Sequence, residues 1–112
     1  MSESDIQRAI LDWLHWHKVL CWRNNSGAFV LQGETGSRRF FRAGMKGASD
    51  IIGCLPDGKF LAIEVKAPKG RVTDEQAQFI ADVLRNGGVA FVARGVEDVE
   101  REMGETLRRQ LQ

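Results

Sequence analysis

Acidic and basic residues stand close together within an otherwise apolar stretch of the chain. Glu64 and Lys66 are one residue apart in the segment 60–66, and Asp50 lies near the start of the preceding apolar segment, 49–55. Successive side chains of a strand point to opposite faces, so Glu64 and Lys66 would share one face. Charges in so apolar a segment are unfavourable unless they are paired, bind a metal ion or lie at an open sheet end.

The segments 49–55 and 60–66 flank a turn at Pro56 to Lys59, and a hairpin through this turn would place Asp50 roughly opposite Glu64. Two carboxylates and a lysine at one sheet end suit phosphodiester hydrolysis with Mg²⁺ or Mn²⁺, because hard divalent cations prefer oxygen ligands and keep several waters. Such an ion acidifies a bound water, and a lysine can orient that water or stabilise charge on the phosphate. The alternative is an ordinary cross-strand ion pair without a metal.

Hydrophobic spacing predicts the elements that would hold these groups. The chain begins with an amphipathic helix, for which Ser4 is the expected N-cap and Ser2 the competing one. A T-x-x-Q capping box at Thr73 predicts a second helix over about 74–86. A third helix near the end of the chain would place four apolar residues on one side, namely Val96, Val99, Met103 and Leu107.

The predicted strands combine into a mixed sheet flanked by helices. In chain order, they are expected at 19–22, 29–31, 49–55, 60–66 and 89–93. The last strand is continuously apolar, which predicts burial on both faces and parallel pairing after a helical crossover. The order of the main elements is α-β-β-β-α-β-α. A loop over 32–37, followed by three arginines, is expected to be exposed, and the 27–42 hairpin could dock on or exchange with a second copy.

Composition narrows the class of protein. With 112 residues, 43% hydrophobic, the chain suits one domain over 1–112. A net charge of +1 excludes binding of polyanions by bulk charge, but residues 23–71 carry a net charge of +5. No apolar run is long enough for a membrane span, and early acidic residues argue against a targeting signal, so we expect a cytoplasmic protein with Cys21 and Cys54 reduced.

Three stretches together resemble the VRR-NUC branch of the PD-(D/E)xK nuclease superfamily. These are GASDIIG at 47–53, AIEVK at 62–66 and Glu75-Gln76 at the start of a helix that ends in two glycines. The resemblance runs from the first helix to about residue 99 and implies a restriction-endonuclease-like α/β core, with Ser49 where the superfamily name has proline. It also implies the site residues. Asp50, Glu64 and the Val65 carbonyl would bind the metal, and Lys66 would be the catalytic lysine. Gln76 would make a polar contact to the site, and Glu3, or Asp5 as the alternative, would lie beside or on a second metal.

The same resemblance implies a Mg²⁺- or Mn²⁺-dependent, structure-specific DNA endonuclease. Small stand-alone members, common in phages and prophages, look like homodimeric Holliday-junction resolvases. The expected partners are therefore branched DNA, above all four-way junctions, and a second copy of the chain. The expected location is the cytoplasm of a bacterial or phage-infected cell. No membrane or organic cofactor is expected. The alternatives are a flap or single-strand endonuclease in a replication or packaging complex, and a non-catalytic nucleic-acid binding module. Basic residues expected to contact DNA are Arg23, Arg38, Arg39, Arg42, Lys46, Lys69 and Arg71.

Overall fold

A computed structural model describes residues 1–24, 27–33, 36 and 38–110, with side chains described outside 27–32 and 38–43. Three helices and six strands are found in this part of the chain. In chain order they are α1 (Glu3–Trp16), β1 (Leu20–Arg23), β2 (Gly27–Gln32), β3 (Arg38–Ala43), β4 (Ile51–Cys54), β5 (Phe60–Val65), α2 (Asp74–Arg85), β6 (Val89–Ala93) and α3 (Val96–Gln110).

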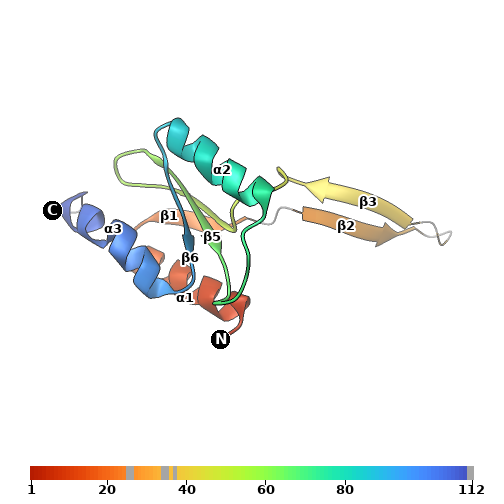
Figure 1. The fold of residues 1–112 in the computed structure, drawn as a ribbon, viewed down its shortest axis with the longest axis horizontal. Coiled ribbons are helices and arrows are strands. Elements are labelled where there is room, and N and C mark those ends of the chain that lie inside the picture. Colours follow the sequence, from red (N-terminus) through yellow and green to blue (C-terminus); the bar gives the residue numbers. More distant parts are fainter. Residues whose placement is uncertain (25–26, 34–35, 37, 111–112) are drawn as a thin grey trace.

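The main sheet has the strand order β1-β4-β5-β6. The pairs β1/β4 and β4/β5 are antiparallel, whereas β5/β6 is parallel, as the crossover through α2 predicts. With β2 and β3 set aside, the elements follow the predicted order α-β-β-β-α-β-α, and the mixed α/β fold is confirmed. Within the described residues, β2 and β3 pair with each other and not with the main sheet, as a hairpin that projects away from it (Figure 1).

Helices cover the two faces of the main sheet, with α2 on one face and α1 and α3 on the other (Figure 1). The alternation of β5 follows this layering: Leu61, Ile63 and Val65 join the core under α1 and α3, whereas Ala62 joins the smaller core under α2. Glu64 therefore lies on the α2 face, where strand alternation predicts it. The same larger core buries Val99, Met103 and Leu107 of α3, which confirms the apolar side expected for that helix.

Capping boxes begin α1 and α2. Thr73 caps α2 as predicted, but Ser2 rather than Ser4 is the N-cap of α1. The Ser2 hydroxyl accepts a hydrogen bond from the Asp5 backbone N–H at 3.1 Å, and the Asp5 carboxylate accepts one from the Ser2 hydroxyl at 2.8 Å. The Ser4 prediction is wrong because a carboxylate three residues after Ser2 closes this reciprocal pair.

Two strand predictions need correction. Strand β6 is only partly buried, with Val89, Phe91 and Val92 partly exposed, because it forms an edge of the described main sheet. Strand β3 is missing from the predicted strands, because only the arginines that follow the 32–37 loop were identified there, although the 27–42 hairpin itself is confirmed. Positions 34, 35 and 37 of the expected loop lie outside the described residues.

The two cysteines are free thiols, as expected from their separation in the sequence. Burial raises the pKa of the Cys21 thiol to about 11, so the group stays protonated at neutral pH. Within the described residues, none of the helices has the length and apolar character needed to cross a bilayer.

Candidate active site

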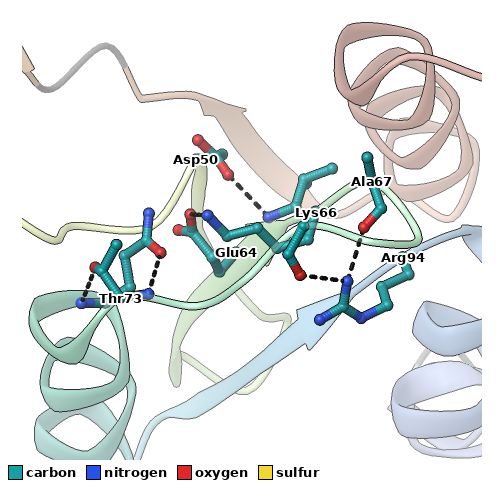
Figure 2. Close-up of polar contacts among 9 residues, drawn as sticks. Asp50, Glu64, Lys66, Ala67, Thr73 and Arg94 are labelled. Carbon is teal, nitrogen blue, oxygen red and sulfur yellow. Dashed lines mark hydrogen bonds and ion pairs between the residues drawn. The ribbon is translucent and has the colours of Figure 1, made fainter.

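Asp50 and Glu64 meet where β5 ends and β4 begins. The register pairs Ile51 with Ile63, so Asp50, one residue before β4, comes beside Glu64. The Val65 backbone N–H donates a 2.8 Å hydrogen bond to Asp50 Oδ2, which fixes the carboxylate against β5. Figure 2 shows Asp50, Glu64 and Lys66 close together at this end of the strand. The structure thus brings together the three residues that the hairpin prediction placed at one site.

Glu64 is a buried carboxylate with an unused acceptor. Only 2% of its surface is exposed, and its Oε2 atom has no hydrogen-bond partner among the described residues. Its Oε1 atom lies 3.7 Å from Lys66 Nζ, a side chain that is itself 11% exposed. A buried acceptor left without a partner is energetically unfavourable. This oxygen is therefore available to a ligand, and the carboxyl group that carries it lies close enough to Asp50 for the two to interact.

The electrostatics of Glu64 follow from this crowding. Burial, and then the neighbouring negative charge of Asp50, raise the pKa of Glu64 to about 8, although Lys66 acts in the opposite direction. In the absence of a further cation, the carboxyl group is thus largely protonated at neutral pH. A positive ion between the two acids would reverse this effect, because it favours the ionised forms of both.

The backbone around Val65 adds a third oxygen. In an extended strand the N–H and C=O of one residue point to the same side. Because the Val65 N–H reaches Asp50, the Val65 carbonyl also faces the side of Asp50. Two carboxylates and a carbonyl form an all-oxygen donor set, which suits Mg²⁺ or Mn²⁺ with waters in the remaining positions. The residues present therefore fit a hydrated divalent ion.

Lys66 is held from two directions. Its backbone N–H donates to the Ala93 carbonyl at 3.0 Å, which extends the β5/β6 ladder by one residue, and its ammonium group faces Glu64. The main chain of Lys66 is thus fixed by the sheet, so the ammonium group stays within reach of any group bound between the two acids.

The cap of α1 separates Glu3 from Asp5. Asp5 is engaged with Ser2, and these hydrogen bonds lower the pKa of the Asp5 carboxyl. The charge of Glu3, in contrast, contributes to raising the pKa of Glu64, so Glu3 lies on the side of the site. Within the residues whose side chains are described, however, no three acidic, histidine or cysteine side chains form one cluster. Glu3 is thus a neighbour of the pair and is not brought into contact with it.

Gln76 acts as a capping residue in the structure. Its Oε1 atom accepts a hydrogen bond from the Thr73 backbone N–H at 2.9 Å, and the Gln76 backbone N–H donates to the Thr73 hydroxyl at 3.2 Å. The amide oxygen is therefore occupied by the cap. The amide nitrogen has no hydrogen-bond partner in the described part of the chain, so it is the atom that could serve the site.

The loop before Asp50 is fastened to the start of α2. Gly47 has a φ of +85°, and a Cβ atom there would lie 2.5 Å from the Glu75 carbonyl oxygen. Lys46 Nζ lies 3.2 Å from Glu75 Oε1, and both side chains are largely exposed. The close approach at Gly47 brings α2, with Gln76, next to the loop that leads through Asp50 into β4.

Four of the seven expected DNA-contacting residues have described side chains. Lys69 and Arg71 are exposed just beyond Lys66, and Arg23 is exposed at the end of β1. Lys46 is paired with Glu75. Arg38, Arg39 and Arg42 belong to β3, and their side chains lie outside the described residues.

Two residues near the site were missed by sequence reasoning. Asn24 follows β1; its backbone N–H donates to the Asp50 carbonyl at 2.7 Å and its side-chain amide to the Ser49 carbonyl at 3.2 Å. Arg94 follows β6 and donates to carbonyls of the loop after Lys66 (Figure 2). A usable signal existed for Arg94, because residues after parallel strands gather at the edge where ligands bind.

A comparison with known protein families finds one match. The VRR-NUC domain family matches residues 1–97, which covers most of the chain and all three residues of the buried cluster. Neither a curated protein nor a solved structure matches the chain significantly. The chain belongs to the VRR-NUC family, nucleases of the PD-(D/E)xK type.

Proposed function

We propose that this chain is a divalent-metal-dependent, structure-specific DNA endonuclease and that Asp50, Glu64 and Lys66 form its catalytic site. The observation that carries the proposal is the buried carboxyl group of Glu64, which has an unpartnered Oε2 atom and is crowded by the charge of Asp50. An ion pair with Lys66 alone accounts for Oε1 but leaves the buried Oε2 atom without a partner, whereas a bound metal ion would give it one. The carboxylates and the Val65 carbonyl would hold Mg²⁺ or Mn²⁺, with Glu3 as an outer acidic residue that could serve a second ion.

Each residue has a distinct task in this mechanism. When bound, the divalent ion would acidify a water molecule and neutralise negative charge on the scissile phosphate. Asp50 and Glu64 fix the position of this centre through the strands that carry them. Lys66 holds its ammonium group where it can stabilise charge on the phosphate or orient the attacking water. The free amide nitrogen of Gln76 would donate to a substrate or water oxygen at the same edge.

The basic residues would hold the DNA by its phosphates. We propose Lys69 and Arg71 as the main backbone contacts, because they are exposed immediately after Lys66. Arg23 and Lys46 flank the site, and the β2–β3 hairpin carries three further arginines, Arg38, Arg39 and Arg42. Contacts of this kind position a duplex without reading its sequence, which suits an enzyme that recognises DNA by its shape.

We further propose that the 112 residues form one nuclease domain that works as a homodimer on four-way DNA junctions. A junction has two related strands to cut, and a two-fold symmetric protein presents two equivalent sites to them. A flap or single-stranded substrate would require only one site. Cleavage of four-way, flapped, linear duplex and single-stranded substrates, together with the mass of the protein in solution, separates these two cases.

The catalytic site is tested by removing Glu64. Purified Glu64→Ala should lose Mg²⁺- or Mn²⁺-dependent cleavage of branched DNA, because one of the two carboxylate ligands of the proposed metal site is removed. Circular dichroism and DNA binding should remain. Retained cleavage by a folded Glu64→Ala protein would refute the proposed site, and loss of folding is checked separately with Glu64→Gln, which conserves shape and removes the charge.

The DNA contacts are tested through salt. Substitution of Lys69 and Arg71 by alanine should weaken DNA binding and flatten the plot of log affinity against log salt concentration by about 1 to 2 units, because fewer counterions are released on binding. Fluorescence anisotropy over a salt series measures both quantities. An unchanged slope would place the DNA on a different surface.

A further inference from the structure

Arg94 is placed at the centre of a tight turn that follows the catalytic strand. Residues 67–70 close this turn with a 2.9 Å hydrogen bond from the Gly70 N–H to the Ala67 carbonyl. The Arg94 Nη1 atom shares its two N–H groups among three carbonyls, those of Ala67 at 2.7 Å, Gly70 at 2.8 Å and, at a longer distance, Pro68 at 3.2 Å. Three of the four carbonyls of the turn therefore converge on a single guanidinium nitrogen.

Arg94 itself is fixed by two elements. It directly follows Ala93, whose carbonyl accepts the Lys66 N–H, and its own N–H donates at 2.7 Å to the Asp98 carboxylate in the first turn of α3. The side chain thus starts from a rigid position and spans the gap between β6 and the turn (Figure 2). Hydrogen bonds from an ionised donor are stronger than neutral ones, so one side chain can hold a turn whose own backbone makes few contacts.

The turn 67–70 carries one exposed basic side chain, that of Lys69. Lys69 is the one residue of 67–70 whose carbonyl does not bind Arg94, and its side chain is exposed together with that of the following Arg71. We propose that Arg94 is a positioning residue for DNA binding: it holds the turn 67–70 so that Lys69 and Arg71 face the substrate backbone. This inference rests on the proposed function, because it takes these two residues as phosphate contacts.

If Arg94 only positions the DNA contacts, its loss should weaken DNA binding but leave the cleavage rate of bound DNA nearly unchanged. Lys66 is held by the Ala93 carbonyl and faces Glu64 without any help from Arg94. Arg94→Gln should therefore weaken DNA binding by about tenfold, while the single-turnover rate at saturating DNA stays within about twofold of the wild type. Arg85→Gln is the matched control: it removes the same charge from an exposed arginine that is paired with Asp82 on α2.

A double-mutant cycle separates positioning from direct contact. In the background of Lys69→Ala and Arg71→Ala, Arg94→Gln should weaken binding by no more than about twofold, because the contacts it positions are already absent. The same loss in both backgrounds would show that Arg94 binds phosphate itself and would overturn the proposal. Hydrogen exchange of the Gly70 amide gives an independent readout, and Arg94→Gln should accelerate it by at least about tenfold relative to Arg85→Gln.

The two proposals fail in different ways. If the wild-type protein binds no DNA of any shape, the proposed function fails and the positioning role fails with it. If the wild type binds and cleaves DNA but Arg94→Gln changes neither Gly70 exchange nor affinity, only the role of Arg94 is overturned. Unfolding in urea, measured for every variant, shows that each comparison is made between folded proteins.

Discussion

Strand β5 has an acid–lysine pair near each of its ends, and the two pairs share their sequence spacing and nearly the same distance but differ in exposure. Asp57 and Lys59 lie in the turn before the strand with their charged atoms 3.9 Å apart, and Glu64 and Lys66 lie at its far end with theirs 3.7 Å apart. The side chains of the turn pair are 33% and 58% exposed, whereas those of the far pair are 2% and 11% exposed. Sequence spacing and distance alone therefore do not distinguish a surface contact from a reactive site.

The partners of the two acids explain the difference. Asp57 accepts hydrogen bonds from the Lys59 N–H at 3.0 Å and from the Gln110 side chain at 2.9 Å, so both of its oxygens are used. Glu64 is packed against a second carboxylate, that of Asp50, and has one oxygen unused. An exposed ion pair contributes roughly 0–1 kcal/mol to stability. The buried pair stores an unfavourable arrangement, which binding of a cation would relieve.

The largest expected contrast is in catalysis, between the two lysines. Lys66→Ala should lower the rate of DNA cleavage on the order of 10²–10³-fold, because it removes a fixed cationic donor at the reacting phosphate. Lys59→Ala removes the same charge at the other end of the strand and should change the rate by less than about twofold. Single-turnover cleavage at saturating DNA measures both. Equal losses would mean that net charge rather than position accounts for the effect.

Stability against pH should show the next largest contrast. The pKa of Glu64 is raised from 4.5 to about 8, so the folded protein keeps a proton that the unfolded chain releases. Without divalent ions, this contribution is complete below about pH 4.5 and is lost as the pH rises through 8, at up to about 1.4 kcal/mol per pH unit. Glu64→Gln lacks this loss, so its stability relative to the wild type should rise by about 2–4 kcal/mol from pH 5 to pH 8.

Urea unfolding in EDTA at several pH values measures this change. A divalent ion should stabilise the wild type at pH 8 through its preference for the folded state, and it should have little effect on Glu64→Gln. If the stability difference between the two proteins were constant from pH 5 to pH 8, the carboxyl group of Glu64 would be neither as buried nor as crowded as the structure shows.

The convergence of Asp50 and Glu64 could be predicted because local rules determine it. The turn at Pro56 to Lys59 sets the register of the hairpin, and strand alternation then sends both acids to one face. The T-x-x-Q box likewise contains the whole cap of α2 within four residues. Each of these features depends only on residues close together in the sequence or joined by one short hairpin.

Other features depend on contacts that no local pattern records. Arg94 binds carbonyls 24 to 27 residues earlier in the chain, and Asn24 binds the backbone of Ser49, which is 25 residues later. Both contacts exist only after the sheet has formed. Ser4 failed as a cap for a different reason: two serines compete within three residues, and the position of Asp5 decides between them through side-chain geometry.

The smallest contrast separates two glycines at opposite ends of the β4–β5 hairpin. Gly47 and Gly58 have similar φ values, +85° and +92°, so alanine at either position is strained by about 1–2 kcal/mol. A Cβ atom at Gly58 meets nothing within 4 Å, whereas one at Gly47 would lie 2.5 Å from the backbone of Glu75. Gly47→Ala should therefore lower the free energy of unfolding by about 1–2 kcal/mol more than Gly58→Ala.

The backbone oxygen of Glu75 cannot move aside as a flexible side chain would, because it belongs to the first turn of α2. Relief of the clash must instead shift the loop that leads to Asp50, so Gly47→Ala should also slow DNA cleavage, whereas Gly58→Ala should not. Urea unfolding and cleavage assays on both variants measure the two effects. Equal behaviour of the two glycines would show that the contact between this loop and α2 is not needed to hold Asp50 beside Glu64.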